Sequence, residues 1–360
     1  MIQAMEPFHA TRLGVLMEPD PNDPREAGGV LNPALARGRD GQLYLFPRLV
    51  AAGNYSRIGI ARVVLDAHGD PVGVERLGLA LEPVESYEKN SETGGGVEDP
   101  RITFVEPLDC YLMTYTAFSE AGPRIALASS RDLFHWERLG LVQFTRLGDI
   151  DFGAVNNKDA VIFPEFVHDP EGRPSLGLIH RPLFPGTKPT DAMAQQRIHH
   201  ESLWISYCAA ADLLELGHWE FGQHHRLLSP RASWERIKVG AGAPPILTRL
   251  GWLLVYHGVG GSLQHRHFHY SAGAAVLDAR NPCRVVYRSP HPILAPGPQE
   301  HSGVVPDVVF PTGLDRRTDI GQPSRFDMYF GMADDRIGVA SFRIPRSLTL
   351  PAGEDEHRAA

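Results

Sequence analysis

Residues 57–63 read RIGIARV, a short stretch in which apolar and small side chains alternate. Similar stretches return four more times along the chain, as RIALASS at 124–130, LWISYCA at 203–209, YSAGAAVLD at 270–278 and RIGVASF at 336–342. Alternation with a period of two is typical of a β-strand that has one buried face. The sequence therefore predicts one strand type that is used five times.

Two further strand types precede each copy, always in the same order and with a period of 65–80 residues. The second type, directly before each copy, reads QLYLFPRL at 42–49, CYLMTYTA at 110–117, SLGLIHRP at 175–182, WLLVYHGV at 252–259 and DMYFGMAD at 327–334. The first type reads NPAL at 32–35, EDPRITFV at 98–105, DAVIFPEF at 159–166, GAPPILT at 242–248 and VPDVVFP at 305–311.

A repeat of three or four short strands is the sequence signature of a propeller blade, whose apolar face only the next blade can cover. High glycine and proline contents (36 and 30 residues) and the lack of long helical periodicity agree with an all-β chain. We therefore expect an all-β, five-bladed β-propeller that forms a single domain over residues 1–350, with a disordered tail at 351–360. A pair of β-sandwiches is the alternative, but it gives no reason for a fivefold repeat.

The composition limits the classes of partner and the cellular location that we expect for the protein. A net charge of −8 argues against nucleic acid and anionic membranes as main partners, since both favour a basic surface. The three cysteines are scattered, which suggests reduced thiols. No segment approaches the roughly 20 apolar residues that cross a bilayer, and the N-terminal stretch does not resemble a signal peptide. We expect a cytoplasmic protein, and a homo-oligomer stays open.

Polar residues occupy equivalent places in the repeats. In a propeller the first strand of each blade lines the central channel, so these residues should converge in space. The set at the first strands is Asn32, Asp99, Lys158, Asp159, Lys238 and Asp307, and the set near the ends of the second strands is Arg48, Tyr115, Arg181, His257 and Asp334.

The stretch GGGVEDPRI at 94–102 places two carboxylates directly behind three glycines. Taken alone, such a stretch is most often a turn. Because successive strand residues face opposite sides, Glu98 and Asp99 should diverge, and only Asp99 should reach a ligand. Arg101 is then expected to point away as a structural partner. No helix follows the glycines, so they predict no nucleotide site.

A metal site is not expected. His265, His267 and His269 could share one strand face, but no acidic residue stands at ligand spacing from them. We read them as part of an exposed loop and expect neither a metal nor an organic cofactor.

Eight motifs, taken in order, resemble a known family. They are VEDPRIT at 97–103, MTYTA at 113–117, ASSRDLFHWERLG at 128–140, NKDAVIFPE at 157–165, LIHRP at 178–182, WERIKVGAG at 234–242, GWLLVYHGV at 251–259 and VVFPTG at 308–313. Each is weak singly, but their order and spacing are specific. Over nearly its whole length the chain resembles the β-mannoside phosphorylases of glycoside hydrolase family 130, which are five-bladed propellers.

The resemblance implies residue roles. Asp99 would be the catalytic general acid, and Lys158, Arg181, His257 and Tyr270 would hold phosphate. With the convergent positions added, the expected substrate-binding set is Asn32, Arg48, Arg57, Glu98, Tyr115, Asp159, Lys238 and Asp307. One departure stands out: relatives commonly show Gly-Asp-Val-Pro-Asn before the last VVFP, and Val304 stands here where they have the aspartate.

The residues also fit this chemistry without the family name. An inverting hydrolase needs a second carboxylate to activate water, whereas a phosphorylase needs cations that hold phosphate. We expect phosphorolysis of a β-1,4- or β-1,2-linked mannoside to α-mannose 1-phosphate, with inorganic phosphate as co-substrate and the pKa of Asp99 raised. The alternatives are an inverting β-mannoside hydrolase of the same family and a non-catalytic carbohydrate-binding propeller.

Overall fold

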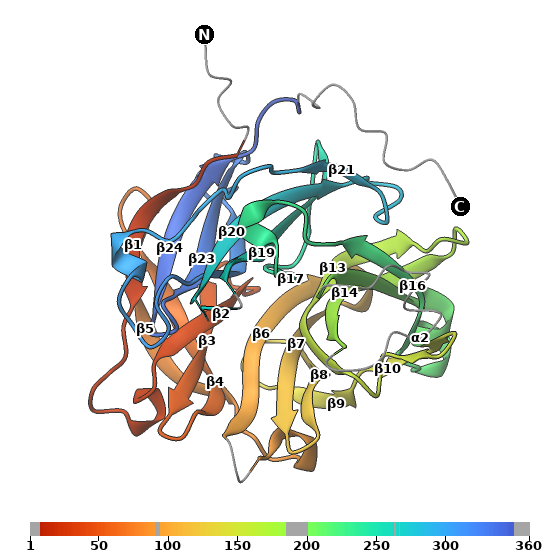
Figure 1. The fold of residues 1–360 in the computed structure, drawn as a ribbon, viewed down its shortest axis with the longest axis horizontal. Helices are drawn as coiled ribbons and strands as arrows, with labels where there is room; N and C mark the ends of the chain where they lie inside the picture. The colour runs from red at the N-terminus through yellow and green to blue at the C-terminus, as the bar shows by residue number, and fades with distance from the viewer. Residues whose placement is uncertain (1–7, 91–93, 185–200, 263, 266, 349–360) are drawn as a thin grey trace.

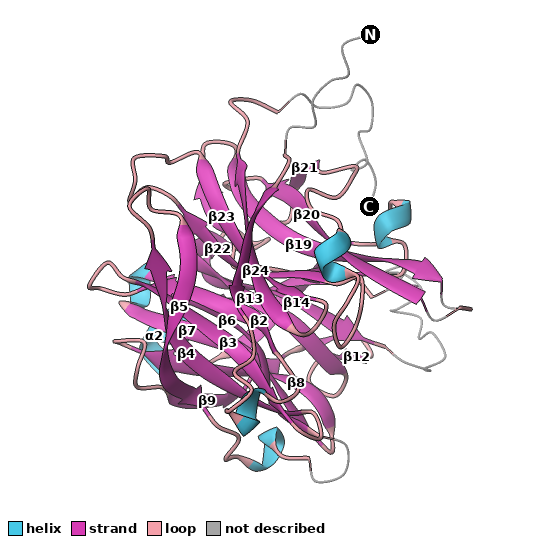
Figure 2. Ribbon diagram, turned by 90° about the vertical axis from the view of Figure 1, so that its left-hand side faces the viewer, coloured by secondary structure: helices cyan, strands magenta, loops and turns pink. Residues whose placement is uncertain are grey.

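The computed structural model describes residues 8–348 except 91–93, 185–200, 263 and 266. Within these residues the chain is nearly all strand (Figure 2), which confirms the all-β prediction. The expected disordered tail at 351–360 lies outside the described residues. In the part of the chain that the structure describes, no helix is long and apolar enough to cross a membrane.

Antiparallel meanders follow one another along the chain, one for each predicted repeat. The first two contain β2 (Val30–Arg37), β3 (Leu43–Ala51), β4 (Tyr55–Leu65) and β5 (Pro71–Leu81), then β6 (Gly95–Val105), β7 (Cys110–Ser119), β8 (Gly122–Ser130) and β9 (Glu137–Leu141). The third contains β13 (Asn156–His168), β14 (Pro174–Leu183), β15 (Leu203–Ala209) and β16 (Glu220–Leu228).

The last two meanders complete the series. The fourth contains β17 (Lys238–Ala241), β18 (Ile246–Thr248), β19 (Gly251–Ser262), β20 (His267–Leu277) and β21 (Val285–Arg288). The fifth contains β22 (Val309–Arg316), β23 (Arg325–Met332) and β24 (Arg336–Arg343), and β1 (Thr11–Met17) pairs antiparallel with β24. In Figure 1 the strands β2, β6, β13 and β17 lie nearest the middle of the molecule, while β5, β9, β16 and β21 lie at its periphery.

The remaining elements are short. They are β10 (Gln143–Phe144), β11 (Arg146–Leu147), β12 (Ile150–Asp151), α2 (Ala210–Leu216) and the 3-10 turns η1 (Pro24–Glu26), η2 (Ser86–Glu88), η3 (Glu106–Leu108), η4 (Ser233–Glu235) and η5 (Pro298–Glu300).

The predicted order of three strand types is confirmed in every meander, but the sheets are not five separate blades. Parallel pairing of Tyr55 with Gly95 and of Ser56 with Gly96 joins β4 to β6. The first two meanders therefore form one eight-stranded sheet. The expectation of a closed ring of five separate blades is for this reason not confirmed.

Apolar side chains pack between each meander and the next. Phe46 and Val97 belong to the core between the first and second meanders, and Leu45 packs with Tyr329 between the first and the fifth. Similar clusters join the second meander to the third, the third to the fourth and the fourth to the fifth. Burial of these faces against one another is the main stabilising contribution that the fold offers.

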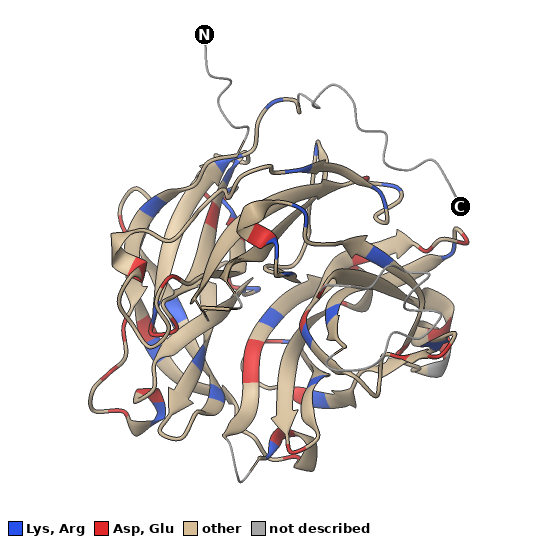
Figure 3. Cartoon of the chain, in the orientation of Figure 1, with Lys and Arg blue, Asp and Glu red and all other residues tan. Residues whose placement is uncertain are grey.

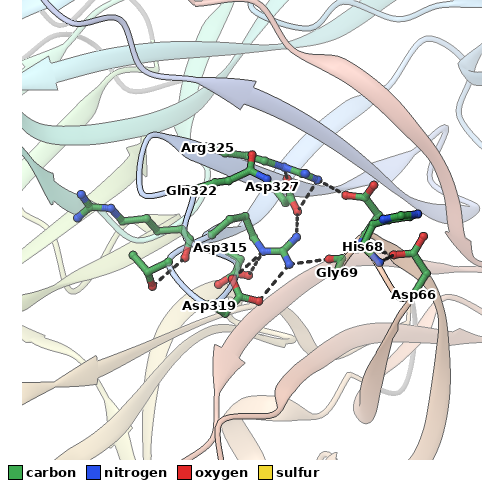
Figure 4. A network of polar contacts seen from close by, with 12 residues as sticks. Asp66, His68, Gly69, Asp315, Asp319, Gln322, Arg325 and Asp327 are labelled. Atoms are coloured by element: carbon green, nitrogen blue, oxygen red, sulfur yellow. Dashed lines mark hydrogen bonds and ion pairs between the residues drawn. The ribbon is translucent and has the colours of Figure 1, made fainter.

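A polar network also ties the fifth meander to the first (Figure 4). Arg317 is fully buried, pairs with Asp319 at 3.0 Å and with Asp327, and donates to the carbonyl oxygen of Gly69 at 2.5 Å. Gly69 lies in the turn between β4 and β5, so the contact joins segments that are far apart in the sequence. The first and fifth meanders are thus linked by hydrogen bonding as well as by apolar packing.

Candidate active site

Four polar residues in equivalent places of the repeats share a left-handed backbone. The φ angles are 45° at Asn32, 47° at Asp99, 55° at Asp159 and 61° at Asp307. Asn and Asp are the non-glycine residues that tolerate this conformation best. At the first three, the strand pairing shifts register across the residue, as in a β-bulge, which re-aims a side chain.

The bulge overturns one expectation. Glu98 and Asp99 do not diverge to opposite faces, because the left-handed turn at Asp99 breaks the strand alternation. Arg48 contacts both, at 2.8 Å from Glu98 Oε1 and 3.2 Å from Asp99 Oδ1. Both carboxylates therefore belong to the same site.

Asn32, Arg48, Glu98, Asp99 and Lys158 form what we call the Asp99 cluster. The Asn32 side-chain amide donates to Asp99 Oδ1 at 2.8 Å, and Lys158 Nζ lies 3.3 Å from Glu98 Oε2. The two carboxylates are almost fully buried. Figure 3 shows acidic and basic segments side by side on β6. The cluster thus joins side chains from β2, β3, β6 and β13 at one place.

The protonation state of Asp99 differs from the expected one. Burial alone would raise its pKa, but the charges of Arg48, Lys158 and Arg101, with the hydrogen bond from Asn32, outweigh burial and lower the pKa below its ordinary value. The prediction of a raised pKa is therefore wrong. Asp99 is an ionised carboxylate in the free protein.

A second group of charges surrounds Asp159, which is 2% exposed. Arg181 Nε donates to Asp159 Oδ2 at 2.7 Å, Arg101 Nη2 lies 3.3 Å from Oδ1, and His257 Nε2 lies 3.7 Å from Oδ2. Arg181 also forms a close ion pair with Glu201. We call Arg101, Asp159, Arg181, Glu201 and His257 the Asp159 cluster.

His257 is neutral rather than cationic. Its burial lowers the pKa to about 3, against the opposing effect of Asp159. Neither ring nitrogen has a hydrogen-bond partner within the described chain, and the ring packs on Phe310 with centroids 4.3 Å apart. A buried imidazole without a partner is a group that a polar ligand would satisfy.

Lys238 and Tyr270 lie beside this cluster. Lys238 Nζ is 5.5 Å from the centroid of the Tyr270 ring, and the ring of Tyr270 is 5.9 Å from that of His257. Burial, with the charge of Arg181, lowers the pKa of Lys238. The predicted phosphate ligands Arg181, His257 and Tyr270 thus lie together, while Lys158 pairs with the Asp99 cluster.

Arg101 joins the two clusters, although we expected it to point away. Its guanidinium donates to the carbonyl oxygens of Asp99 and Ala241 at 3.0 Å and of Gly242 at 3.2 Å, in addition to its contact with Asp159. The side chain is 1% exposed. It is a structural link between three meanders and is not accessible to a ligand.

Two predicted substrate-binding residues contact neither cluster. Arg57 pairs with Glu82 at 3.2 Å, and the Tyr115 hydroxyl donates to Glu88 Oε1 at 2.7 Å inside the core between the first two meanders. Side chains alternate between the two faces of β7, and Tyr115 lies on the face that packs into the core between the first two meanders.

Asp307 makes contacts that the sequence did not suggest. Its carboxylate lies 2.6 Å from His301 Nδ1 and 3.2 Å from His267 Nε2, and its carbonyl oxygen accepts from the Tyr270 amide at 2.9 Å. Val304, in the same loop, is 63% exposed. The loop therefore borders the Asp159 cluster through Tyr270.

Sequence reasoning missed Glu201 and gave Asp334 no role. Glu201 forms an isolated parallel bridge with Lys238, which holds its backbone near the Asp159 cluster and its side chain against Arg181. An isolated bridge has no strand pattern in the sequence that would predict it. Asp334 ends the second strand type of the last repeat, and its position there was the available signal. Its carboxyl group responds to the charges of Arg48, Asp99 and Lys158.

A cavity of about 590 Å³ lies elsewhere. It is lined by Arg37, Arg39, Phe104, Tyr111 and Asp315 among others, at the far ends of β2, β6 and β22 from the bulges. None of its lining residues belongs to either cluster.

Comparison with known proteins agrees with the geometry. The family model described as beta-1,4-mannooligosaccharide phosphorylase matches residues 9–350. A 1,2-beta-oligomannan phosphorylase from Thermoanaerobacter sp. (strain X514) is 32% identical over 308 residues, which cover 84% of this chain and 86% of the relative. A beta-1,4-mannooligosaccharide phosphorylase from Ruminococcus albus is 29% identical over 265 residues, which cover 73% and 67%.

Solved structures share the fold. The beta-1,2-mannobiose phosphorylase from Listeria innocua, in complex with beta-1,2-mannobiose, matches with a TM-score of 0.71 and 23% identity over 94% of this chain and 97% of that one. A structure reported as evidence that the family contains glycoside hydrolases targeting beta-1,2 mannosidic linkages in Candida mannan matches with a TM-score of 0.68 and 23% identity over 97% of both chains. The chain belongs to glycoside hydrolase family 130, the family of the mannoside phosphorylases.

Proposed function

We propose that the protein is an inverting phosphorylase that cleaves a β-1,2- or β-1,4-linked mannoside with inorganic phosphate and releases α-mannose 1-phosphate. One observation carries the proposal: the Asp99 cluster, in which Asp99 is ionised, adjoins the Asp159 cluster, which contains Arg181 and the unpartnered His257 and has Lys238 beside it. The first suits a sugar, and the second suits an anion. Relatives named as mannoside phosphorylases support the same chemistry.

On the phosphate side, Arg181 supplies a planar pair of donors and Tyr270 a hydroxyl. Burial raises the pKa of Tyr270 to about 12, so the hydroxyl keeps its proton. His257, being neutral, donates one hydrogen bond and accepts another. Lys158 would reach the same anion from the Asp99 cluster, because its Cα pairs with that of Arg181 across β13 and β14.

On the sugar side, Asn32, Arg48, Glu98 and Asp99 present amide, guanidinium and carboxylate groups that match sugar hydroxyls. We propose Asp99 as a catalytic residue that touches the reacting sugar. We also propose that the five meanders act as the blades of one propeller and that residues 1–350 form a single catalytic domain. The packing of every meander on the next supports this view.

Phosphate dependence tests the proposed function directly. Incubation with β-1,2- and β-1,4-linked mannobiose should yield α-mannose 1-phosphate only when phosphate is present, as followed by phosphorus NMR. Release of free mannose at the same rate with and without phosphate would indicate a hydrolase. Failure to turn over any β-mannoside would favour the sugar-binding alternative.

Hydrolysis is the second candidate, and Glu201 is the observation that favours it. Its carboxylate lies in the Asp159 cluster beside Arg181, where it could activate water or repel phosphate. The side chain is 33% exposed, so solvent reaches it. Its close ion pair with Arg181 instead argues that Glu201 balances the charge of that arginine.

Replacement of Glu201 by Gln separates the two candidates. In a phosphorylase, loss of the negative charge should lower KM for phosphate about 5-fold, equivalent to roughly 1 kcal/mol for one partly exposed charge, with kcat little changed. Glu215→Gln, on the exposed face of α2, is the matched control. If Glu201→Gln instead abolishes release of free mannose, Glu201 is the base of a hydrolase.

A further inference from the structure

The cavity of about 590 Å³ lies between the first strands of three meanders. Strands β2, β6 and β22 supply most of its lining, and β3 and β7 each add one residue. Because paired strands hold these residues in place, the cavity is formed before any ligand arrives. Its volume falls within the roughly 300–1,000 Å³ that is usual for small-molecule sites in proteins.

The cavity is separate from the two catalytic clusters. On β6 its lining residue Phe104 comes five residues after Asp99, and on β2 its lining residue Arg37 comes five residues after Asn32. With a rise of about 3.3 Å per strand residue, each pair is roughly 15 Å apart. A small ligand in the cavity therefore does not contact the Asp99 carboxylate, and the cavity is a site of its own.

One part of the lining is apolar. It includes the side chains of Leu35, Leu43, Ile102 and Leu314 and the rings of Phe104 and Tyr111. The two rings lie with their centroids 5.0 Å apart. The Tyr111 hydroxyl donates to the carbonyl oxygen of Arg37 at 2.9 Å, so this polar group is already satisfied. Such a surface suits the C–H face of a ring, which loses contact with water when it binds.

The charged part of the lining is already balanced. Arg37 pairs with Asp315 at 2.6 Å and with Asp319 at 3.1 Å, two carboxylates that Figure 4 shows together. Arg39 pairs with Asp109 at 2.7 Å. Each lining arginine thus has a carboxylate of its own, and no unbalanced positive charge is left to hold an anion. A neutral ligand fits these pairs better than a charged one.

The same pairs keep hydrogen-bonding capacity. Within the part of the chain that the structure describes, Arg39 donates only through Nη2, so its Nε and Nη1 groups are available. Its guanidinium lies 5.3 Å from the centroid of the Phe104 ring and is about half exposed. The carboxylate oxygens of Asp315 can each accept more than the contacts from arginine that they make. Donors and acceptors therefore stand beside an apolar wall.

We propose that this cavity is a second carbohydrate site, which binds a neutral sugar of one to three rings without cleaving it. Sugar hydroxyls both donate and accept, so they match Arg39 and Asp315, while the C–H face of the sugar ring packs on the apolar wall. The inference goes beyond the proposed function and does not depend on it, since binding here needs neither phosphate nor turnover.

Methyl NMR of the full-length protein tests the proposal. Leucine methyl groups are labelled with carbon-13, and the protein is titrated with β-1,4-mannobiose, cellobiose or maltose in phosphate-free buffer. The signals of Leu43 and Leu314 report on the cavity. At least one sugar should move both signals saturably at concentrations on the order of 10 mM, as a millimolar Kd requires.

Two variants connect the signals to the cavity. Arg39→Ala should raise the Kd at Leu43 and Leu314 about 5-fold, through the loss of its hydrogen bonds, with kcat and KM for mannobiose unchanged. Leu314→Trp fills the cavity and should abolish the shift at Leu43, and thermal unfolding checks that it is folded. Arg131→Ala is the matched control, because Arg131 also lies near Asp109, at 4.0 Å, but does not line the cavity.

Three results would overturn the proposal. If none of the three sugars moves the Leu43 and Leu314 signals, the cavity is a water-filled channel only. If sodium benzoate moves them and the sugars do not, the site takes an anion with an apolar body. If Arg39→Ala and Leu314→Trp leave the sugar titration unchanged, the signals report on another site. A wild type that fails to use phosphate would refute the proposed function alone, because the titration involves no turnover.

Discussion

Asp99→Asn should lower kcat for phosphorolysis of mannobiose on the order of 10²–10⁴-fold, with sugar affinity nearly unchanged. Asn keeps the shape, tolerates the left-handed φ of 47°, and can still contact Asn32, so the loss is one of charge. The charge matters most in the transition state, where the anomeric carbon becomes positive. A loss that appears in kcat and not in KM would be its signature.

The same variant should also lower the pKa of Asp334, because the Asp99 carboxylate is one of the groups that raise it. Carbon-13 NMR of the Asp334 carboxyl carbon, followed as the pH is changed, measures the shift. Asp109→Asn is the control, because Asp109 also has a left-handed φ, of 49°, but lies on the surface beside Arg39. Undiminished turnover in Asp99→Asn would refute a catalytic role for Asp99.

Arg101→Met should reduce the free energy of unfolding by about 3–5 kcal/mol. The side chain is almost fully buried and donates to three carbonyl oxygens and to Asp159, which joins the second meander to the third and fourth. Methionine fills part of the volume but leaves these acceptors without a donor. Chemical denaturation followed by tryptophan fluorescence measures the change.

A surface arginine gives the comparison. The Arg131 side chain is 79% exposed and lies 4.0 Å from Asp109, so Arg131→Met should change stability by less than about 0.5 kcal/mol. If Arg101→Met lowers the free energy of unfolding by less than about 1 kcal/mol, the hydrogen bonds of Arg101 contribute little to stability and only its packing matters.

The repeats were predictable because period-two alternation is set locally by each strand. RIGIARV and its four relatives all fell in the third strand of a meander. The pairing of β4 with β6 was not predictable, since it depends on Gly95 and Gly96 approaching the backbone of residues 55 and 56. A Cβ at Gly96 would lie 2.2 Å from the Ser56 carbonyl oxygen, a contact that becomes visible only in three dimensions.

At the site, residue type was predictable and electrostatics were not. The position of Asp99 followed from its place in the repeat. Its pKa, however, depends on how close Arg48, Lys158 and Arg101 lie to it, and the sequence does not give these distances. The left-handed bulge at Asp99 was not predictable either, because the sequence Glu-Asp-Pro is also common at the start of a regular strand. The partners of Arg57 and Tyr115 were not predictable either, because no repeat pattern indicates that they pair with Glu82 and Glu88.

The recurring left-handed residue limits how the site can change over time. At Asn32, Asp99, Asp159 and Asp307 the backbone accepts Asn, Asp or Gly and resists other residues by roughly 1–2 kcal/mol. Because Asn and Asp have almost the same size, a single substitution at any of the four exchanges a neutral amide for a negative charge and leaves the sheet intact. Relatives that keep this backbone can therefore diverge in which repeat carries charge, while the outline of the site stays nearly constant.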